Sequence, residues 1–462
     1  MKIRTIQTML VVFLAFVTIA GATPLDDYVA QPDPSYSYEL VQTINHPQGK
    51  VYVIKMTSQT WRSASEVNRT LWQHWLTIIV PLDVASDTAL LWINGGSNER
   101  QTPPEPDGML VEIALQSETV VADLRMVPNQ PLVFTDDPDN ERYEDEIIAY
   151  TFDKFLTTGD ATWPLLLPMV KSAVRAMDTV QDHIAKIAHG SYAINDFVVS
   201  GGSKRGWTTW LTAAVDERVL AIAPIVIDVL NMGEQMKHHY EAYGFYSSAI
   251  GDYEDMNVLG NLESEEGTDI RNFVDPYAYR ERFTMPKFLI NSAGDQFFLP
   301  DSAQFYFDDL PDDKYLLYCP NTDHGLDGSD ADSALLAWYA SLLAGRSRPD
   351  FDWEIPETGH LKVTARTQPQ QVTLWTATNP EARDFRLETI GKAWKSEQLK
   401  PTRTARTEYY DVTVPAPEKG WTAYFVEMLF DSDTPIPFRF STEVRVVPDV
   451  LPFADDGAAA AR

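Results

Sequence analysis

A serine at position 203 lies in the segment whose residue types could most readily do chemistry. From Phe197 to Gly206 the sequence reads FVVSGGSKRG, so an apolar run leads into two glycines and the serine. Apolar residues then recur at helical spacing, at Trp207, Trp210, Leu211 and Ala214. A serine at such a strand-to-helix turn is exposed, because small neighbours let the backbone bend sharply. We predict that Ser203 is a nucleophile that attacks a carbonyl carbon.

The second half of this segment departs from the usual Gly-x-Ser-x-Gly pattern of a nucleophile elbow. Arg205 stands where a small residue is expected, and Gly206 comes one residue late. A plain glycine-rich turn or a phosphate-binding loop would also place glycines here. A phosphate loop ends in Gly-Lys-Ser/Thr, whereas the order here is Ser-Lys-Arg-Gly, so the elbow is the favoured interpretation.

Chain order indicates which residues could assist the serine, because hydrolases with this turn place an acid and then a histidine after it. Asp295 follows the predicted strand Lys287–Asn291, and His324 follows the next one, Lys314–Tyr318. We predict that His324 accepts the proton of Ser203 and that Asp295 orients the imidazole. Among the eight histidines, only His324 and His360 follow Asp295, and His360 falls in a later β-rich region.

Three other aspartates compete with Asp295, namely Asp228, Asp301 and Asp323. Asp228 is the strongest competitor, because it lies at the end of an earlier predicted strand where some hydrolases place their acid. Asp295 is favoured because its Gly-Asp loop follows the penultimate predicted strand.

Backbone N–H groups beside these residues could stabilise an oxyanion. One candidate donor is Lys204, the residue after the nucleophile. Gly95 and Gly96 end the predicted strand Ala89–Ile93 and could supply a second donor. The two glycines are equally compatible with a simple turn.

The elements that must position these residues alternate between short apolar runs and helical patterns. This order predicts a mostly parallel sheet flanked by helices. A polar and aromatic insertion at about 231–282 could be a lid over the site or a surface excursion. Besides those named above, the predicted elements are the strands Val51–Met56, Trp75–Pro81, Thr119–Leu124, Phe197–Val199 and Ala223–Val229, and the helices Leu167–Ala188 and Asp332–Ala344.

The chain divides into three predicted parts. Residues 1–22 combine Lys2 and Arg4 with an apolar run and an Ala-Gly-Ala site, which is typical of a signal peptide and predicts a secreted or periplasmic protein. Residues 23–345 form the predicted catalytic domain. After a linker at Arg346–Pro349, alternating runs within 346–462 predict a small β-sandwich.

Composition excludes several classes of partner. The formal charge of -30 disfavours nucleic acid and anionic membranes, and no later segment is apolar and long enough to insert into a bilayer. The single cysteine, Cys319, cannot form an intramolecular disulfide and is interpreted as a buried thiol. No metal or cofactor site stands out, because His238 and His239 are adjacent and the acidic run Asp252–Asp255 lacks calcium-loop spacing. The oligomeric state does not follow from the sequence.

With these residues, the chain resembles the PhoPQ-activated pathogenicity-related protein family, which includes the secreted autocrine proliferation repressor proteins of amoebae. The most specific segment is Gly202–Thr208, whose Ser-Lys-Arg-Gly is similar to the form that this family uses. The resemblance implies an α/β-hydrolase fold related to prolyl-oligopeptidase-type peptidases, with Ser203, Asp295 and His324 where their triad falls. It also rests on Thr23–Val29, Thr57–Trp61, Asn94–Gly96, Glu146–Thr151 and Thr162–Pro164.

Two function classes follow. The first is a secreted serine hydrolase, either a peptidase of the aminopeptidase or dipeptidyl-peptidase kind or an esterase, acting on small peptides or esters. The acidic cluster Glu144-Asp145-Glu146, with Glu144 and Glu146 as the predicted binding residues, could bind the free amino group of a peptide, although it could also be the solvated acidic start of a helix. The second class is a secreted signalling or binding protein on a hydrolase scaffold, because fold does not imply function.

Overall fold

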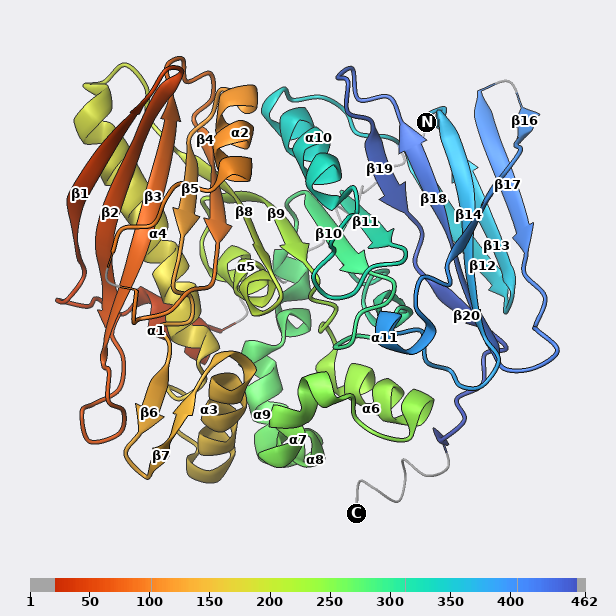
Figure 1. Cartoon of the computed structure of the whole chain (residues 1–462), viewed down its shortest axis with the longest axis horizontal. Helices are drawn as coiled ribbons and strands as arrows, with labels where there is room; N and C mark the ends of the chain where they lie inside the picture. The colour runs from red at the N-terminus through yellow and green to blue at the C-terminus, as the bar shows by residue number, and fades with distance from the viewer. Residues whose placement is uncertain (1–20, 101, 312, 405, 455–462) are drawn as a thin grey trace, which may run out of the picture.

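A nine-stranded sheet dominates the computed structural model, which describes residues 21–454 except positions 101, 312 and 405 (Figure 1). The six strands from β5 to β11 in the sheet order run parallel, and β1, β2 and β3 continue the sheet antiparallel. In spatial order the strands are β1 (Ser37–His46), β2 (Gly49–Thr60), β3 (Leu71–Pro81), β5 (Val121–Leu124), β4 (Thr88–Ile93), β8 (Asp196–Gly202), β9 (Val219–Ile225), β10 (Lys287–Ser292) and β11 (Lys314–Cys319).

Burial explains which of these strands the sequence predicted. All six residues of β10 are buried, as expected for a parallel strand covered on both faces. Strand β1 lies at the sheet edge with mostly exposed residues, and it was not predicted from the sequence. The strand predicted at Ala223–Val229 was wrong in its bounds, because β9 ends at Ile225 and the chain turns out of the sheet at Val226, whose φ is +45°.

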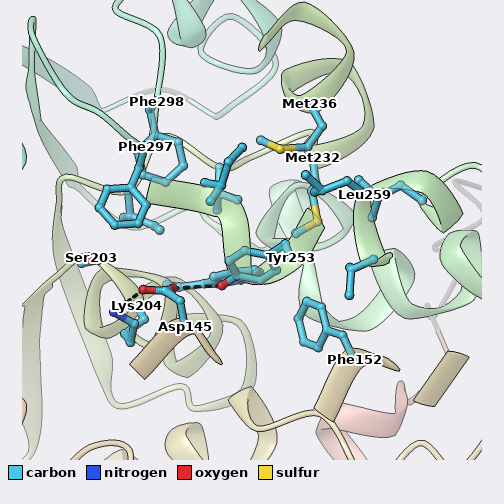
Figure 2. A pocket seen from close by; sticks show the side chains of 16 residues that line it. Asp145, Phe152, Ser203, Lys204, Met232, Met236, Tyr253, Leu259, Phe297 and Phe298 are labelled. Atoms are coloured by element: carbon cyan, nitrogen blue, oxygen red, sulfur yellow. Dashed lines mark hydrogen bonds and ion pairs between the residues drawn. The ribbon is translucent and has the colours of Figure 1, made fainter. Parts of the chain in front are cut away.

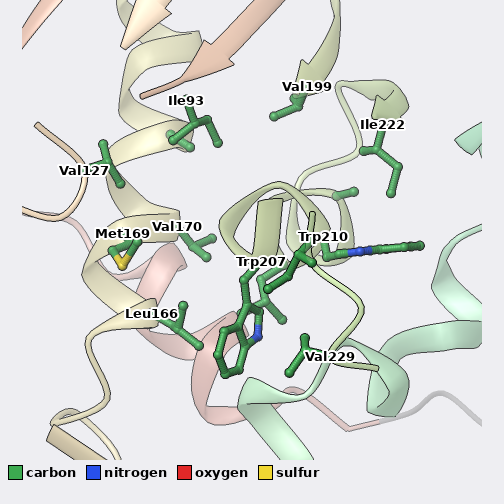
Figure 3. Packing of buried hydrophobic residues seen from close by; sticks show 14 of the residues in the cluster. Ile93, Val127, Leu166, Met169, Val170, Val199, Trp207, Trp210, Ile222 and Val229 are labelled. Atoms are coloured by element: carbon green, nitrogen blue, oxygen red, sulfur yellow. The ribbon is translucent and has the colours of Figure 1, made fainter. Parts of the chain in front are cut away.

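Helices cover both faces of the sheet. On one face lie α1 (Pro24–Ala30), α4 (Leu166–Ala188) and α5 (Lys204–Val215), and on the other lie α2 (Gly108–Ser117) and α10 (Ala331–Leu343). Helix α5 begins directly after Ser203 and is therefore the helix that positions the candidate nucleophile. The buried Trp207 of α5 lies on the side of Leu166 of α4, whereas Trp210 points to the opposite side (Figure 3) and its ring lies 4.8 Å from that of Phe283. Apolar contacts thus fix α5 on two sides.

The insertion between β9 and β10 folds into short helices. In Figure 1 they gather at the end of the sheet toward which β4, β10 and β11 point. The indole N–H of Trp207 donates to the carbonyl of Val274 at 2.6 Å and so joins α5 to this insertion. The elements are α6 (Met232–Tyr243), η1 (Ser248–Ile250), α7 (Gly251–Asp255), α8 (Val258–Asn261), α9 (Glu265–Val274) and η2 (Pro276–Arg282). Helix α3 (Glu144–Thr158) and the hairpin of β6 (Leu132–Phe134) and β7 (Asp137–Arg142) lie at the same end.

The C-terminal region forms two further sheets that stack on each other (Figure 1). It contacts the main sheet through β19, where the Tyr318 N–H donates to Ser441 Oγ at 3.0 Å and the rings of Phe288 and Phe440 are 5.3 Å apart. One sheet contains β12 (Phe351–Glu357), β13 (His360–Ala365), β17 (Thr407–Thr413) and β16 (Thr402–Thr404), and the other contains β15 (Lys395–Gln398), β14 (Gln371–Asn379), β18 (Trp421–Phe430), β19 (Phe438–Ser441) and β20 (Arg445–Val447).

Three predictions concern features away from the site. The signal peptide predicted at 1–22 lies, apart from its last two residues, outside the described residues. Cys319 is buried, and burial raises the pKa of its thiol to about 12. No helix between residues 21 and 454 is both long and apolar enough to cross a membrane.

Candidate active site

Ser203 occupies a strained turn between β8 and α5. Its φ of +58° is uncommon for a residue with a side chain, and its N–H donates to the Ile225 carbonyl at 2.8 Å. A Cβ added to Gly201 would lie 2.9 Å from the Cβ of Arg205, and one added to Gly206 would lie 2.9 Å from the Gly201 carbonyl oxygen. Gly201 therefore leaves room for the bulky Arg205. Gly206 is needed because any side chain there would lie too close to the Gly201 carbonyl oxygen.

His324 and Asp295 contact each other on neighbouring loops after β11 and β10. The distance from His324 Nδ1 to Asp295 Oδ2 is 2.8 Å, and an ionised carboxylate can only accept, so Nδ1 carries the proton. The other ring nitrogen, Nε2, is buried and has no hydrogen-bond partner among the described residues. The backbone N–H of Phe297 donates to the second carboxylate oxygen at 2.7 Å. This arrangement fixes the imidazole through Nδ1 and leaves Nε2 for a third group.

Asp228 is fully engaged elsewhere. The hydroxyls of Tyr306 and Tyr318 each donate to one of its carboxylate oxygens at 2.5 Å. Burial raises the pKa of Asp228 to about 7, against the lowering effect of these two hydrogen bonds. The strongest competitor for the acid role therefore does not contact His324.

The remaining competitors also have other partners. Asp301 is buried between Arg383 and His238, with 2.5 Å to the guanidinium and 3.1 Å to the imidazole. Asp323 accepts a hydrogen bond from the N–H of Gly325 at 3.0 Å. Of the four candidate acids, Asp295 is the one hydrogen-bonded to His324.

A segment of the C-terminal region contacts the loops that follow β10 and β11, on which Asp295 and His324 lie. The connection from β14 to β15, which contains α11 (Leu387–Ile390), lies beside the ends of β10 and β11 (Figure 1). The Leu387 N–H donates to the Gly294 carbonyl at 2.9 Å. Asn321 donates from Nδ2 to the Trp394 carbonyl at 3.1 Å and accepts from its N–H at 3.0 Å. Residues more than sixty positions away in sequence thus help to hold the acid and histidine loops.

An ion-pair cluster lies beside the start of α5. Lys204 Nζ is 2.9 Å from carboxylate oxygens of both Glu144 and Asp145, and Arg205 Nη2 is 2.6 Å from Glu144. Burial alone would raise the pKa of Glu144, but the hydrogen bond and charge of Arg205 and the charge of Lys204 outweigh it and hold the pKa at about 2. Glu144 is therefore ionised and already bound to cations of the protein.

The loop after β4, with the predicted oxyanion residues Gly95 and Gly96, lies against Arg205. A Cβ on Gly95 would be 2.7 Å from the guanidinium, so the glycine provides room for this side chain. The Gly95 N–H donates to Asn94 Oδ1 at 2.9 Å, and the Gly96 carbonyl accepts from the Gln130 amide at 3.1 Å. Lys204 is the first residue of α5, where a backbone N–H has no partner within the helix.

A mostly apolar cavity opens beside Ser203 and continues beneath the insertion (Figure 2). It measures about 580 Å³, including the part open to solvent. Phe297 and Phe298, from the loop after Asp295, form one side, and the ring of Phe297 lies 4.3 Å from that of His324. Figure 2 shows Met232 and Leu259 of the insertion on the side away from these phenylalanines. The insertion thus supplies part of the wall of the site.

The acidic residues at the start of α3 are arranged differently from the sequence hypothesis. Asp145 lines the cavity, whereas Glu144 binds Lys204 and Arg205, and Glu146 is paired with Arg142. The sequence hypothesis named Asp145 only as a member of the acidic cluster, and it did not name Phe297 or Phe298. Both phenylalanines follow Asp295 within three positions, and this closeness in sequence could have identified them as site residues.

The fold and the site together define an α/β-hydrolase scaffold. The sheet is mostly parallel and covered on both faces, a strained serine lies at the β8–α5 turn, and an acid and a histidine follow β10 and β11. The fold class predicted from the sequence is confirmed. Among the described residues, no group of three or more His, Cys, Asp or Glu is placed to hold a metal ion.

The chain belongs to the PhoPQ-activated pathogenicity-related protein family, whose sequence model matches residues 25–386. It is similar to autocrine proliferation repressor protein A of Dictyostelium discoideum, with 36% identity over 97% of this chain and 95% of that protein. Among solved structures, an acetyl xylan esterase from Paenibacillus sp. R4 matches 69% of this chain and 92% of its own, with 13% identity and a TM-score of 0.49. An acylaminoacyl peptidase from Pyrococcus horikoshii matches 68% of this chain and 51% of its own, with 11% identity and a TM-score of 0.40.

Proposed function

We propose that this protein is a serine hydrolase in which Ser203 is the nucleophile, His324 the general base and Asp295 the residue that orients the base. The observation that carries the proposal is the imidazole of His324, held by Asp295 through Nδ1 while Nε2 has no partner among the described residues. His183 and His239 also each have a buried ring nitrogen without a partner among the described residues. His324 differs because a carboxylate holds its other nitrogen and its ring lies 4.3 Å from that of Phe297, which lines the same cavity as Ser203. A catalytic base needs one nitrogen free to take a proton.

The reaction follows from these roles. Ser203 Oγ attacks the substrate carbonyl carbon, and its proton passes to His324 Nε2. The tetrahedral intermediate collapses when the imidazolium returns this proton to the leaving oxygen or nitrogen, which leaves an acyl group on Ser203. A water molecule then attacks this ester, again losing its proton to His324, and the acid product and free serine are released. Asp295 keeps its negative charge and stabilises the imidazolium.

The oxyanion of the intermediate needs N–H donors. The Lys204 N–H is the first proposed donor, because the first N–H groups of a helix have no partner within the helix and lie at the positive end of its dipole. Gly95 and Gly96 stay candidates for the second donor. For Gly95 this requires that the N–H exchange its bond to Asn94 for one to the substrate.

The proposed substrates are small peptides or esters, cleaved by a secreted or periplasmic enzyme. The chemistry uses only side chains and backbone groups of this chain and requires no cofactor. The formal charge of -30 makes nucleic acid an unfavourable partner.

A second candidate is a secreted growth-repressing signal protein on the same scaffold. The observation that favours it is the 36% identity to a protein named autocrine proliferation repressor protein A, which extends over almost the whole chain. In that case Ser203 and His324 would be retained for folding or binding instead of turnover.

Hydrolysis assays with and without the nucleophile separate these candidates. A panel of p-nitrophenyl esters and peptide p-nitroanilides is tested on the purified protein, on Ser203→Ala and on Ser37→Ala, whose serine is exposed on the edge strand β1. We expect turnover by the wild type and Ser37→Ala and its loss in Ser203→Ala. Absence of turnover across the panel would favour the signalling candidate, and equal turnover in Ser203→Ala would refute Ser203 as nucleophile.

A further inference from the structure

The cavity beside Ser203 has a wall chemistry that selects a class of substrate. Apart from Ser203, its polar wall groups are Asp145, Lys204 and the hydroxyl of Tyr253, and the remaining lining side chains are apolar. The apolar part is made by aromatic, aliphatic and methionine residues from the β9–β10 insertion, from α3, from α5 and from the loop after Asp295.

The polar groups of the wall are already paired with each other. Lys204 Nζ contacts Asp145 Oδ2 at 2.9 Å, and the Tyr253 hydroxyl donates to Asp145 Oδ1 at 3.0 Å (Figure 2). The neighbouring carboxylate of Glu144 is bound by Lys204 and Arg205. A substrate ammonium would therefore have to displace a cation of the protein. The wall favours an uncharged apolar group instead.

The position of His324 indicates which side of the substrate occupies the cavity. The leaving group must depart beside the imidazole, which returns a proton to it, and Phe297 covers that ring. The part of the wall formed by Met232, Met236 and Leu259 belongs to the insertion and lies away from Phe297 in Figure 2. Because the leaving group departs beside His324, we expect the acyl side of the scissile bond to occupy this other part of the cavity. Flexible methionine side chains adapt to groups of different shape.

We propose, on the basis of the serine-hydrolase function above, that the substrate carries an apolar group of at least about four carbons on the acyl side of the scissile bond. Two kinds of substrate share this chemistry, namely esters of apolar carboxylic acids and peptides with a large apolar residue before the cleaved bond. Each methylene buried in an apolar pocket favours binding by about fourfold. Two methylenes beyond acetate therefore raise kcat/KM by about fifteenfold.

Two substrate series measure this preference at constant leaving group. The first consists of p-nitrophenyl acetate, butyrate, hexanoate and octanoate, and the second of acylated alanine, leucine and phenylalanine p-nitroanilides. We expect kcat/KM to rise by about tenfold or more from acetate to butyrate, or from alanine to leucine, and the series that shows the rise identifies the kind of substrate. Equal or falling kcat/KM in both series would overturn the proposal.

Substitutions in the cavity test whether this wall causes the preference. Leu259 is half-buried on α8, so Leu259→Trp narrows the cavity and Leu259→Ala widens it. The matched control is Leu220→Trp on β9, whose leucine is exposed and lies outside the cavity. We expect Leu259→Trp to reduce the preference for the longer acyl group at least fivefold, Leu259→Ala to shift the optimum to a longer group, and Leu220→Trp to leave it unchanged. An unchanged preference in both Leu259 variants would overturn the proposal.

Covalent labelling separates failure of this inference from failure of the proposed function. A small fluorophosphonate needs the nucleophile but little of the cavity. Labelling of Ser203 without any preference for longer acyl groups would support the serine-hydrolase function and refute the proposed apolar acyl-binding cavity. No labelling and no turnover of either series would reject the proposed function, and the inference with it.

Discussion

Asn321 allows a quantitative test of the contact between the C-terminal segment and the histidine loop. Its side chain makes two hydrogen bonds to the backbone of Trp394, at 3.1 and 3.0 Å, and its own φ is +60°. Each neutral hydrogen bond contributes about 1 kcal/mol, so Asn321→Gly should lower the free energy of unfolding by about 2 kcal/mol. Alanine at this φ costs about 1 kcal/mol more than glycine or asparagine, so Asn321→Ala should lose about 3 kcal/mol.

A matched control isolates the backbone contribution. Asn257 also has a left-handed φ, of +53°, but it is exposed and lies at the start of α8, where its side chain does not cap the helix. Asn257→Ala should therefore cost only the backbone part, about 1 kcal/mol. Urea unfolding followed by tryptophan fluorescence measures all three variants, and kcat/KM toward one ester reports the effect on His324, three residues after Asn321. If Asn321→Ala lost no more stability than Asn257→Ala, the contact with Trp394 would not support the histidine loop.

Three further predictions concern the turn, the acid and the ion-pair cluster. An added Cβ on Gly201 would lie 2.9 Å from two carbonyl oxygens, whereas one on Gly202 meets nothing within 4 Å. Thermal unfolding should therefore show Gly201→Ala destabilised by about 1–3 kcal/mol and Gly202→Ala nearly unchanged. Similar unfolding midpoints for the two variants would contradict this prediction. Asp295→Asn should lower kcat by orders of magnitude and Asp228→Asn only mildly, and steady-state kinetics with the opposite ranking would refute the acid assignment. Because the pKa of Glu144 is lowered from 4.5 to about 2, the stability that its ionised form contributes is fully present above pH 4.5 and is lost as the pH falls toward 2. Glu144→Gln should therefore be less stable than the wild type at pH 7 and should lose less stability between pH 4.5 and pH 2. Parallel curves of stability against pH for the two proteins would contradict this prediction.

The fold was predictable for those elements whose burial produces an apolar pattern in the sequence. The covered parallel strands are short apolar runs, and the α5 residues spaced from Trp207 to Ala214 are all buried, as their helical spacing predicted. Strand β7, Asp137–Arg142, contains almost only polar residues and pairs with β6 through its backbone, so no apolar pattern could reveal it. The exposed edge strand β1 was missed for the same reason.

The site was predictable only as far as chain order constrains it. The order of serine, acid and histidine indicated Asp295 and His324, which contact each other in the structure. The binding of Glu144 by Lys204 and Arg205 joins residues about sixty positions apart, and no local spacing encodes it. The contact of Asn321 with the C-terminal segment is equally non-local.

The central claim is that Ser203 is an activated nucleophile, and mass spectrometry of a covalent adduct tests it most directly. The purified protein is incubated with a fluorophosphonate, digested, and the modified residue is mapped; His324→Ala is treated in parallel as a base-less control. We predict a single adduct on Ser203 in the wild type, formed at a rate that falls by orders of magnitude in His324→Ala. An unmodified Ser203 in folded protein, or labelling at the same rate without His324, would contradict this account.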